Sequence, residues 1–201
     1  MNDKVRAKIA KVYELAKRGE YGEKEVAKKM LNKFIEKYNL NQQDIENIKK
    51  QEYRFKYTSK MEMWLITALV DYFIEDLNGV QMYRDTNGVK EIMIPLEYLD
   101  YVTVLSAYEY FRRHMRKQFE KACLLEIKRC RTRKTKNKRR AELQEIFFSK
   151  YIYASNLYKE HQIEQIDLSK VSKKELKDRL NLEAIEGGAY NTQVTTGLYL
   201  E

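Results

Sequence analysis

The chain has 201 residues, of which 43% are hydrophobic and 12% aromatic, enough to fold as one substantial domain or as a domain with a small module. Its 39 Lys and Arg residues exceed its 30 Asp and Glu residues and give a formal net charge of +9, which favours a polyanionic partner. No stretch approaches the ~18 to 20 apolar residues of a membrane span, and no apolar signal region opens the chain, so we expect a cytoplasmic protein without membrane contact.

Two amphipathic helices are predicted at the start of the chain. The first covers residues 3–18, where apolar side chains recur at helical spacing (Val5, Ile9, Val12 and Ala16). The second begins near Glu23, after the sequence GEYG, and we expect Asn39 and Asn41 to terminate it. Residues 1–50 are therefore predicted to form a helical hairpin module.

Aromatic and basic residues alternate in the next segment. In an extended chain, Tyr53, Phe55 and Tyr57 lie on one face while Arg54 and Lys56 lie on the other, so we expect a short strand here. Two interpretations stay open: the rings form a platform on which nucleic-acid bases stack, or an edge strand covers the core with its aromatic side.

The middle of the chain, residues 51–127, is predicted to form a core. Residues 60–77 are apolar on more than half of a helical circumference, which indicates a central helix. The dipeptide Asn87-Gly88 favours a tight turn between two strands, and we expect Pro95 to end the second strand. A long amphipathic helix follows the hairpin.

The stretch KRCRTRKTKNKRR, residues 128–140, contains nine cations and no carboxylate. The nine are Lys128, Arg129, Arg131, Arg133, Lys134, Lys136, Lys138, Arg139 and Arg140. Outside this run, the remaining 30 basic residues equal the 30 acidic ones. Such a dense local excess indicates a segment that binds the phosphates of DNA or RNA; a solvated loop without a partner is the alternative.

Long helices are predicted on both sides of this run. The run itself is either a loop that joins an antiparallel helix pair or a charged helical turn that forms when phosphates neutralise it. We favour the loop in the free protein and treat residues 128–140 as a basic connector. Residues 141–201 are expected to form a long helix, a short helix that begins at a capping box of Ser172 and Glu175, and an extended C-terminal tail packed on the core.

The N-terminal pattern resembles a known family. The matching residues are Lys4-Val5-Arg6, Ala10, Leu15-Ala16, Glu25, Ala27, Lys37-Tyr38 and Asp44, followed by Trp64 in the next helix and then by the hairpin turn. This order of parts is similar to that of the family called domain of unknown function 2786, over nearly the full length of the chain. The resemblance implies the architecture above and a phage or mobile-element setting, and it implies no particular activity.

Four residues with soft or borderline metal-binding side chains occur, namely His114, Cys123, Cys130 and His161. Their spacing does not match the closely paired ligands of structural zinc sites, so we expect no metal and no cofactor. The two cysteines are predicted to lie on one helix and too far apart for a disulfide, and we expect reduced thiols.

Carboxylates offer one catalytic hypothesis. Asp71, Glu75 and Asp76, together with Glu91 or Asp100, are candidates for the site of a metal-dependent nuclease. Salt-bridged acids on a solvated helix face explain the same pattern more simply. The sequence contains no HExxH motif, P-loop or G-x-S-x-G motif.

The sequence thus predicts a predominantly α-helical α+β fold: a helical hairpin, then a helix, a small β-hairpin sheet and two long antiparallel helices. The predicted function is non-catalytic binding of DNA or RNA by a phage-type protein, with weak sequence preference because a mobile tip lacks fixed geometry. One alternative is a phage-encoded, anti-CRISPR-like inhibitor that acts on a host nuclease or its guide RNA. The other is a metal-dependent nuclease, and the oligomeric state stays open.

Overall fold

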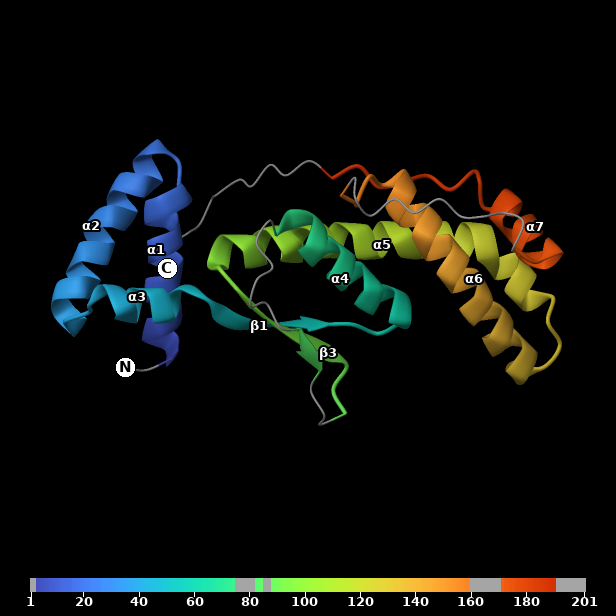
Figure 1. Ribbon diagram of the computed structural model, residues 1–201, viewed down its shortest axis with the longest axis horizontal. Helices are drawn as coiled ribbons and strands as arrows, with labels where there is room; N and C mark the ends of the chain where they lie inside the picture. The colour runs from blue at the N-terminus through green and yellow to red at the C-terminus, as the bar shows by residue number, and fades with distance from the viewer. Residues whose placement is uncertain (1–2, 75–81, 85–87, 160–170, 191–201) are drawn as a thin grey trace. The chain divides into compact units, whose positions relative to one another are not determined.

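The computed structural model describes residues 3–74, 82–84, 88–159 and 171–190 (Figure 1). Helices dominate these residues and a small antiparallel sheet completes them, which confirms the predominantly α-helical α+β fold. The chain divides into two compact units, one formed by residues 1–57, 76–105 and 192–201 and the other by residues 58–75 and 106–191. These boundaries differ from the consecutive segments expected from the sequence, because strand pairing joins stretches that are distant along the chain.

The first unit opens with the predicted helical hairpin. Helices α1 (Asp3–Arg18) and α2 (Tyr21–Tyr38) lie side by side in Figure 1, with Val12, Leu15 and Ala27 buried in an apolar cluster between them. Helix α2 ends where Asn39 adopts a left-handed conformation with φ 49°, one that asparagine tolerates better than most residues.

A third helix, α3 (Gln42–Lys49), was not predicted. Asn41 starts this helix, whereas the sequence suggested that it only ends the preceding one. Its side chain accepts a hydrogen bond from the Asp44 backbone N–H at 2.8 Å, and the Asp44 carboxylate accepts one from the Asn41 N–H at 3.0 Å. This reciprocal capping box lets a short polar helix form, and its Ile48 packs with Ile9 and Ala10 of α1.

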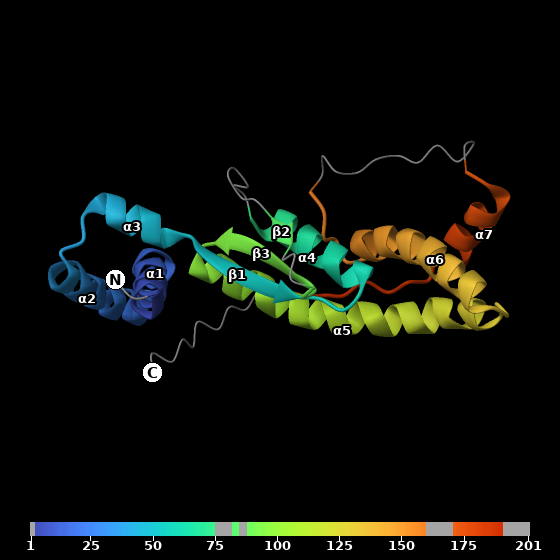
Figure 2. The same ribbon diagram turned by 90° about the horizontal axis from the view of Figure 1, so that it is seen from below.

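The sheet of the first unit has the order β1-β3-β2, with both pairs antiparallel (Figure 2). Its strands are β1 (Gln51–Lys56), β2 (Tyr83–Arg84) and β3 (Glu91–Leu96). The predicted hairpin between β2 and β3 is present: Gly88 has the positive φ of 80° that suits a turn, while Asn87 lies outside the described residues.

The expectation that Pro95 ends the second hairpin strand was wrong, because β3 continues to Leu96. Strand β2 pairs only with Ile92 and Met93. At Pro95, β3 therefore has a described neighbour on one side alone, where it lies opposite Glu52 of β1. A strand tolerates a residue without a backbone N–H at such an edge-like position.

The second unit contains α4 (Lys60–Phe73), α5 (Tyr98–Lys128) from Ser106 onward, α6 (Arg133–Ala154) and α7 (Lys173–Asn181). The predicted N-cap Ser172 accepts a hydrogen bond from the Glu175 backbone N–H. Aromatic side chains join α5 to α6, with Phe119 edge-on to Phe147 at 5.1 Å between ring centroids. No helix within the described ranges is long and apolar enough to cross a membrane.

Residues 187–190 pack against the second unit, while the rest of the predicted C-terminal tail lies outside the described residues. The Gly188 backbone N–H donates to Ser155 Oγ at 3.0 Å, and the Tyr190 hydroxyl donates to Ser106 Oγ at 2.7 Å. Glycine is required at Gly187, where a Cβ atom would lie 1.9 Å from the carbonyl oxygen of Ala154. The stretch therefore runs close against the backbone at the end of α6.

Candidate nucleic-acid interface

Most of the basic run is helical. Helix α5 ends at Lys128 and α6 begins at Arg133, so the connector is residues 129–132 and the favoured loop over 128–140 was wrong. Thr132 is the N-cap: its hydroxyl accepts from the Thr135 N–H, and the Thr135 hydroxyl accepts from the Thr132 N–H, both at 3.2 Å. This capping box, together with the good helix propensity of Lys and Arg, outweighs the repulsion between like charges.

Arg139 faces the interior, unlike the other cations of the run. It precedes the buried Leu143 and Phe147 by four and eight residues, which places all three on one side of α6. Its side chain is 13% exposed and forms a bidentate pair with Asp178 of α7, at 2.5 and 2.6 Å. The hydrogen bonds that Arg139 donates to the Asp178 carboxylate raise the pKa of Arg139 above its ordinary value. Its prediction as a phosphate contact was therefore wrong.

Arg139 forms ion pairs with carboxylates on α5, on its own helix α6 and on α7. Its guanidinium lies 3.9 Å from Glu126 Oε2 on α5 and 3.7 Å from Glu142 Oε2 on α6. Lys174 Nζ on α7 lies 2.5 Å from the same Glu142 oxygen, and that hydrogen bond lowers the pKa of Glu142. These contacts orient the start of α6 relative to α5 and α7.

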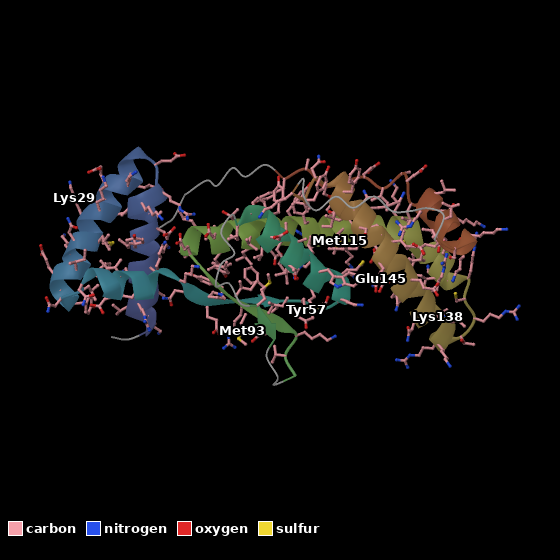
Figure 3. All side chains as sticks on the ribbon, viewed as in Figure 1. Lys29, Tyr57, Met93, Met115, Lys138 and Glu145 are labelled. Atoms are coloured by element: carbon pink, nitrogen blue, oxygen red, sulfur yellow. The ribbon has the colours of Figure 1, made fainter. Side chains whose placement is uncertain are left out.

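The remaining cations divide into one paired residue and seven others. Arg129 bonds to the Glu126 carboxylate. The seven others have no ion pair with any carboxylate in the described ranges, and all are exposed except the half-buried Lys136. We call these seven the basic tip: Lys128, Arg131, Arg133, Lys134, Lys136, Lys138 and Arg140. Figure 3 shows Lys138 near the N-terminal end of α6, where side chains that end in nitrogen extend away from the helix.

The aromatic residues of β1 have structural contacts. The Tyr53 ring stacks on Tyr101 with a centroid separation of 3.8 Å and an interplanar angle of 8°, and burial raises the pKa of Tyr53 to about 12. Phe55 is 1% exposed and lies edge-on to Tyr101, while Tyr57 is half-buried. These contacts favour the interpretation that the strand covers the core with its aromatic side; base stacking stays a prediction.

The predicted nuclease carboxylates have local roles where the structure describes them. Glu91 is buried and accepts a hydrogen bond from Arg54 at 3.0 Å, and Asp100 pairs with Arg18 at 2.8 Å. Asp71 lies on α4, while Glu75 and Asp76 fall outside the described residues. Within the described part of the chain, no group of three or more His, Cys, Asp or Glu side chains could hold a metal ion.

The soft-ligand residues are dispersed. Both cysteines are free, and burial raises the pKa of the Cys123 thiol to about 12, so the thiol stays protonated at neutral pH. His114 Nδ1 lies 2.9 Å from the hydroxyl of Tyr151 on α6. His161 is outside the described residues.

A polar hollow of about 400 Å³ is present in the second unit. Its lining is Glu142, Glu145, Ile146, Ser149, Ser172, Lys174, Glu175, Asp178 and Arg179. Four carboxylates against two cations make it unsuited to a phosphate. The basic tip is therefore the better candidate for an anionic ligand.

No protein-family model, curated protein or solved structure matches the chain. The resemblance to domain of unknown function 2786 accordingly stays a prediction, and the candidate function depends on the residues of the basic tip.

Proposed function

We propose that this protein is a non-catalytic nucleic-acid-binding protein whose basic tip contacts the phosphates of DNA or RNA. The observation that carries the proposal is the concentration of seven cations, none ion-paired within the described ranges, at the junction of α5 and α6. The phage or mobile-element setting belongs to the proposal and depends on the family resemblance.

The electrostatics of this junction favour an anionic partner. The first turn of α6 contains no acidic residue, so its cations add to the partial positive charge that the helix dipole places at a helix N-terminus. Cations separated by three or four residues on a helix also repel one another. A polyanion relieves both unfavourable terms, and release of its condensed counterions adds to the affinity.

The salt dependence of binding tests the proposal. If about six cations contact duplex phosphates, the logarithm of the affinity falls against the logarithm of salt concentration with a slope of about −5. The affinity then drops roughly a thousandfold between 50 and 200 mM salt. Fluorescence anisotropy with labelled duplex DNA, single-stranded DNA and structured RNA measures this slope.

A charge-matched pair of variants locates the site. Replacing Arg131, Arg133, Lys134 and Lys136 together by Gln should flatten the slope by about three to four units without removing the capping threonines. The control replaces four exposed lysines of α1 and α2 by Gln, namely Lys8, Lys29, Lys33 and Lys37. It removes the same charge and should leave the slope within about one unit of wild type.

Three results would contradict the proposal. An unchanged slope in the basic-tip variant would place the binding site elsewhere. Failure to bind any of the three probes at low salt would favour the inhibitor alternative, in which the tip docks into an acidic groove of a host nuclease. Mg²⁺-dependent degradation of the probes would instead favour a nuclease.

A further inference from the structure

The first turns of α6 are exposed around most of their circumference. Every residue from 131 to 141 is exposed except Lys136 and Arg139, which are half-buried. Figure 1 shows α6 crossing α5, with its N-terminal turns lying to one side of α5. The start of α6 is therefore a projecting helix.

The side chains of this projecting helix have a definite order around its axis. At about 100° per residue, Arg133, Asn137 and Ala141 form a line on the side facing away from Arg139. Lys134 and Lys138 flank this line on one side, and Lys136 and Arg140 flank it on the other. An uncharged amide thus lies between two rows of cations.

This arrangement matches the major groove of B-form DNA. An α-helix with its side chains is about 10 to 12 Å across, and the groove is about 12 Å wide with a row of phosphates along each border. Cations on both flanks can then contact both borders while the central line faces the base edges. The major groove of A-form duplex RNA is too narrow and deep to admit such a helix.

We infer that the basic tip recognises duplex DNA, with the first turns of α6 in the major groove and with Arg133 and Asn137 facing the bases. This inference depends on the proposed function and narrows its ligand to one form of nucleic acid. Lys134, Lys138, Lys136 and Arg140 supply phosphate contacts and no sequence information.

Fixed helix geometry also alters the expected specificity. The Arg139–Asp178 pair and the Thr132 capping box set the rotation of α6, so the central line presents a constant face. Arginine pairs with guanine and asparagine with adenine through two hydrogen bonds each. The protein should therefore discriminate among DNA sequences, in contrast to the weak preference expected of a mobile loop.

Two measurements on the full chain test this inference. The first compares anisotropy titrations of a 20-base-pair DNA duplex and the RNA duplex of the same sequence, at one salt concentration; at least tenfold tighter binding of DNA is expected. The second selects preferred duplexes from a random pool and compares Asn137→Ala with wild type. The variant should lose about tenfold in discrimination and keep the salt slope, because no cation is removed.

One control variant and three outcomes distinguish a wrong groove assignment from a lack of nucleic-acid binding. Asn32→Ala changes an exposed asparagine of α2 and should behave as wild type. Equal or tighter binding of the RNA duplex or the single strand, or an unaltered preference in Asn137→Ala, would overturn the groove assignment while leaving nucleic-acid binding intact. Absence of binding to every probe would instead overturn the proposed function.

Discussion

Adjacent arginines of the basic run differ in role. Arg139 pairs with the buried Asp178, whereas Arg140 is exposed and has no ion pair among the described residues. A count of cations treats the two alike. The signal that separates them is present in the sequence, since Arg139 is in helical phase with Leu143 and Phe147, but it becomes usable only once the run is known to be helical.

Replacing Arg139 by Gln should destabilise the protein more than it affects binding. Asp178 is 5% exposed, and removal of its partner leaves a buried charge unpaired, which costs about 3 to 5 kcal/mol in the free energy of unfolding. The salt slope should stay at the wild-type value, because the guanidinium does not face the ligand. Urea denaturation and anisotropy measure the two quantities.

Arg140→Gln is the matched control. The free energy of unfolding should stay within about 0.5 kcal/mol of wild type, and the slope should flatten by about 0.9 unit. Equal losses of stability in the two variants would contradict the assignment of Arg139 as the link between α6 and α7.

Gly187 is a second position where a single substitution should lower the stability of the folded protein. Gly187→Ala places a Cβ atom against the rigid carbonyl of Ala154, so we expect a loss of about 1 to 3 kcal/mol, as for other overpacked sites. Gly22→Ala is the control, since no atom beyond the chain neighbours and the local helix backbone lies within 4 Å of its Cβ position and alanine is the better helix former. Thermal unfolding should rank Gly22→Ala at or above wild type and Gly187→Ala below it.

At the level of elements, periodicity predicted the long helices and the hairpin, because a buried apolar face repeats visibly in the sequence. The misses occur at polar junctions. The sequence predicts Asn41 only as the end of a helix, although asparagine also caps the start of one. Thr132 lacks the usual capping signature, because its partner is Thr135 and not the Glu or Gln that is typical at that position. Such local hydrogen bonds produce no periodic pattern in the sequence.

Two buried carboxylates and two partly exposed cations form a charge network in the first unit. Glu97, the residue before α5, pairs with Arg18 of α1 at 2.8 Å and with Lys49 of α3 at 2.6 Å. Glu14 of α1 is 0% exposed; neither of its carboxyl oxygens accepts a hydrogen bond, and Arg18 Nε lies 3.5 Å from Oε2. Burial, and next the charge of Glu97, raise the pKa of Glu14 to about 7. Protonated Glu14 can donate a hydrogen bond to Glu97.

This pKa predicts a fall in stability with rising pH. The folded protein holds the Glu14 proton where the unfolded chain, with a pKa near 4.5, has lost it. The contribution of this proton to the free energy of unfolding is complete below pH 4.5, declines between pH 4.5 and 7, and is lost above pH 7. The total change is on the order of 3 kcal/mol. Glu97 has the opposite effect on the pH dependence. Burial raises its pKa, but the hydrogen bonds with Lys49 and Glu14 lower it by more, so the net pKa is below the ordinary value. The stability that Glu97 contributes is therefore lost as the pH falls.

Glu14→Gln isolates this effect, because glutamine is neutral and its amide can donate to Glu97 at any pH. Chemical denaturation at pH 5 and pH 8 should show wild type losing stability between the two values and the variant losing much less. The variant should therefore be the more stable protein at pH 8. A wild-type stability that does not vary over this range would show that Glu14 is ionised in the folded state.

For the molecule as a whole, the distribution of charge along the sequence indicates where the candidate site lies. It does not indicate the secondary structure of that segment or the direction in which each cation points. The net charge of +9 arises within residues 128–140, which any charge count reveals. The helical state of that run depends on a threonine pair, and the inward rotation of Arg139 depends on Asp178, which is 39 residues further along the chain. Contacts between residues so far apart are fixed by folding and have no local sequence signal.

Binding at the basic tip should stabilise the folded protein. Duplex DNA at 100 times its dissociation constant should raise the free energy of unfolding by about 2.7 kcal/mol, or the melting temperature by roughly 6 to 10 °C for a chain of this length if it unfolds as a unit. The Gln variant of Arg131, Arg133, Lys134 and Lys136 should show little shift under the same conditions. Hydrogen exchange should slow at the start of α6 and be unchanged in α2. Protection centred on α2 would assign binding to the lysines of the helical hairpin and contradict the role of the basic tip.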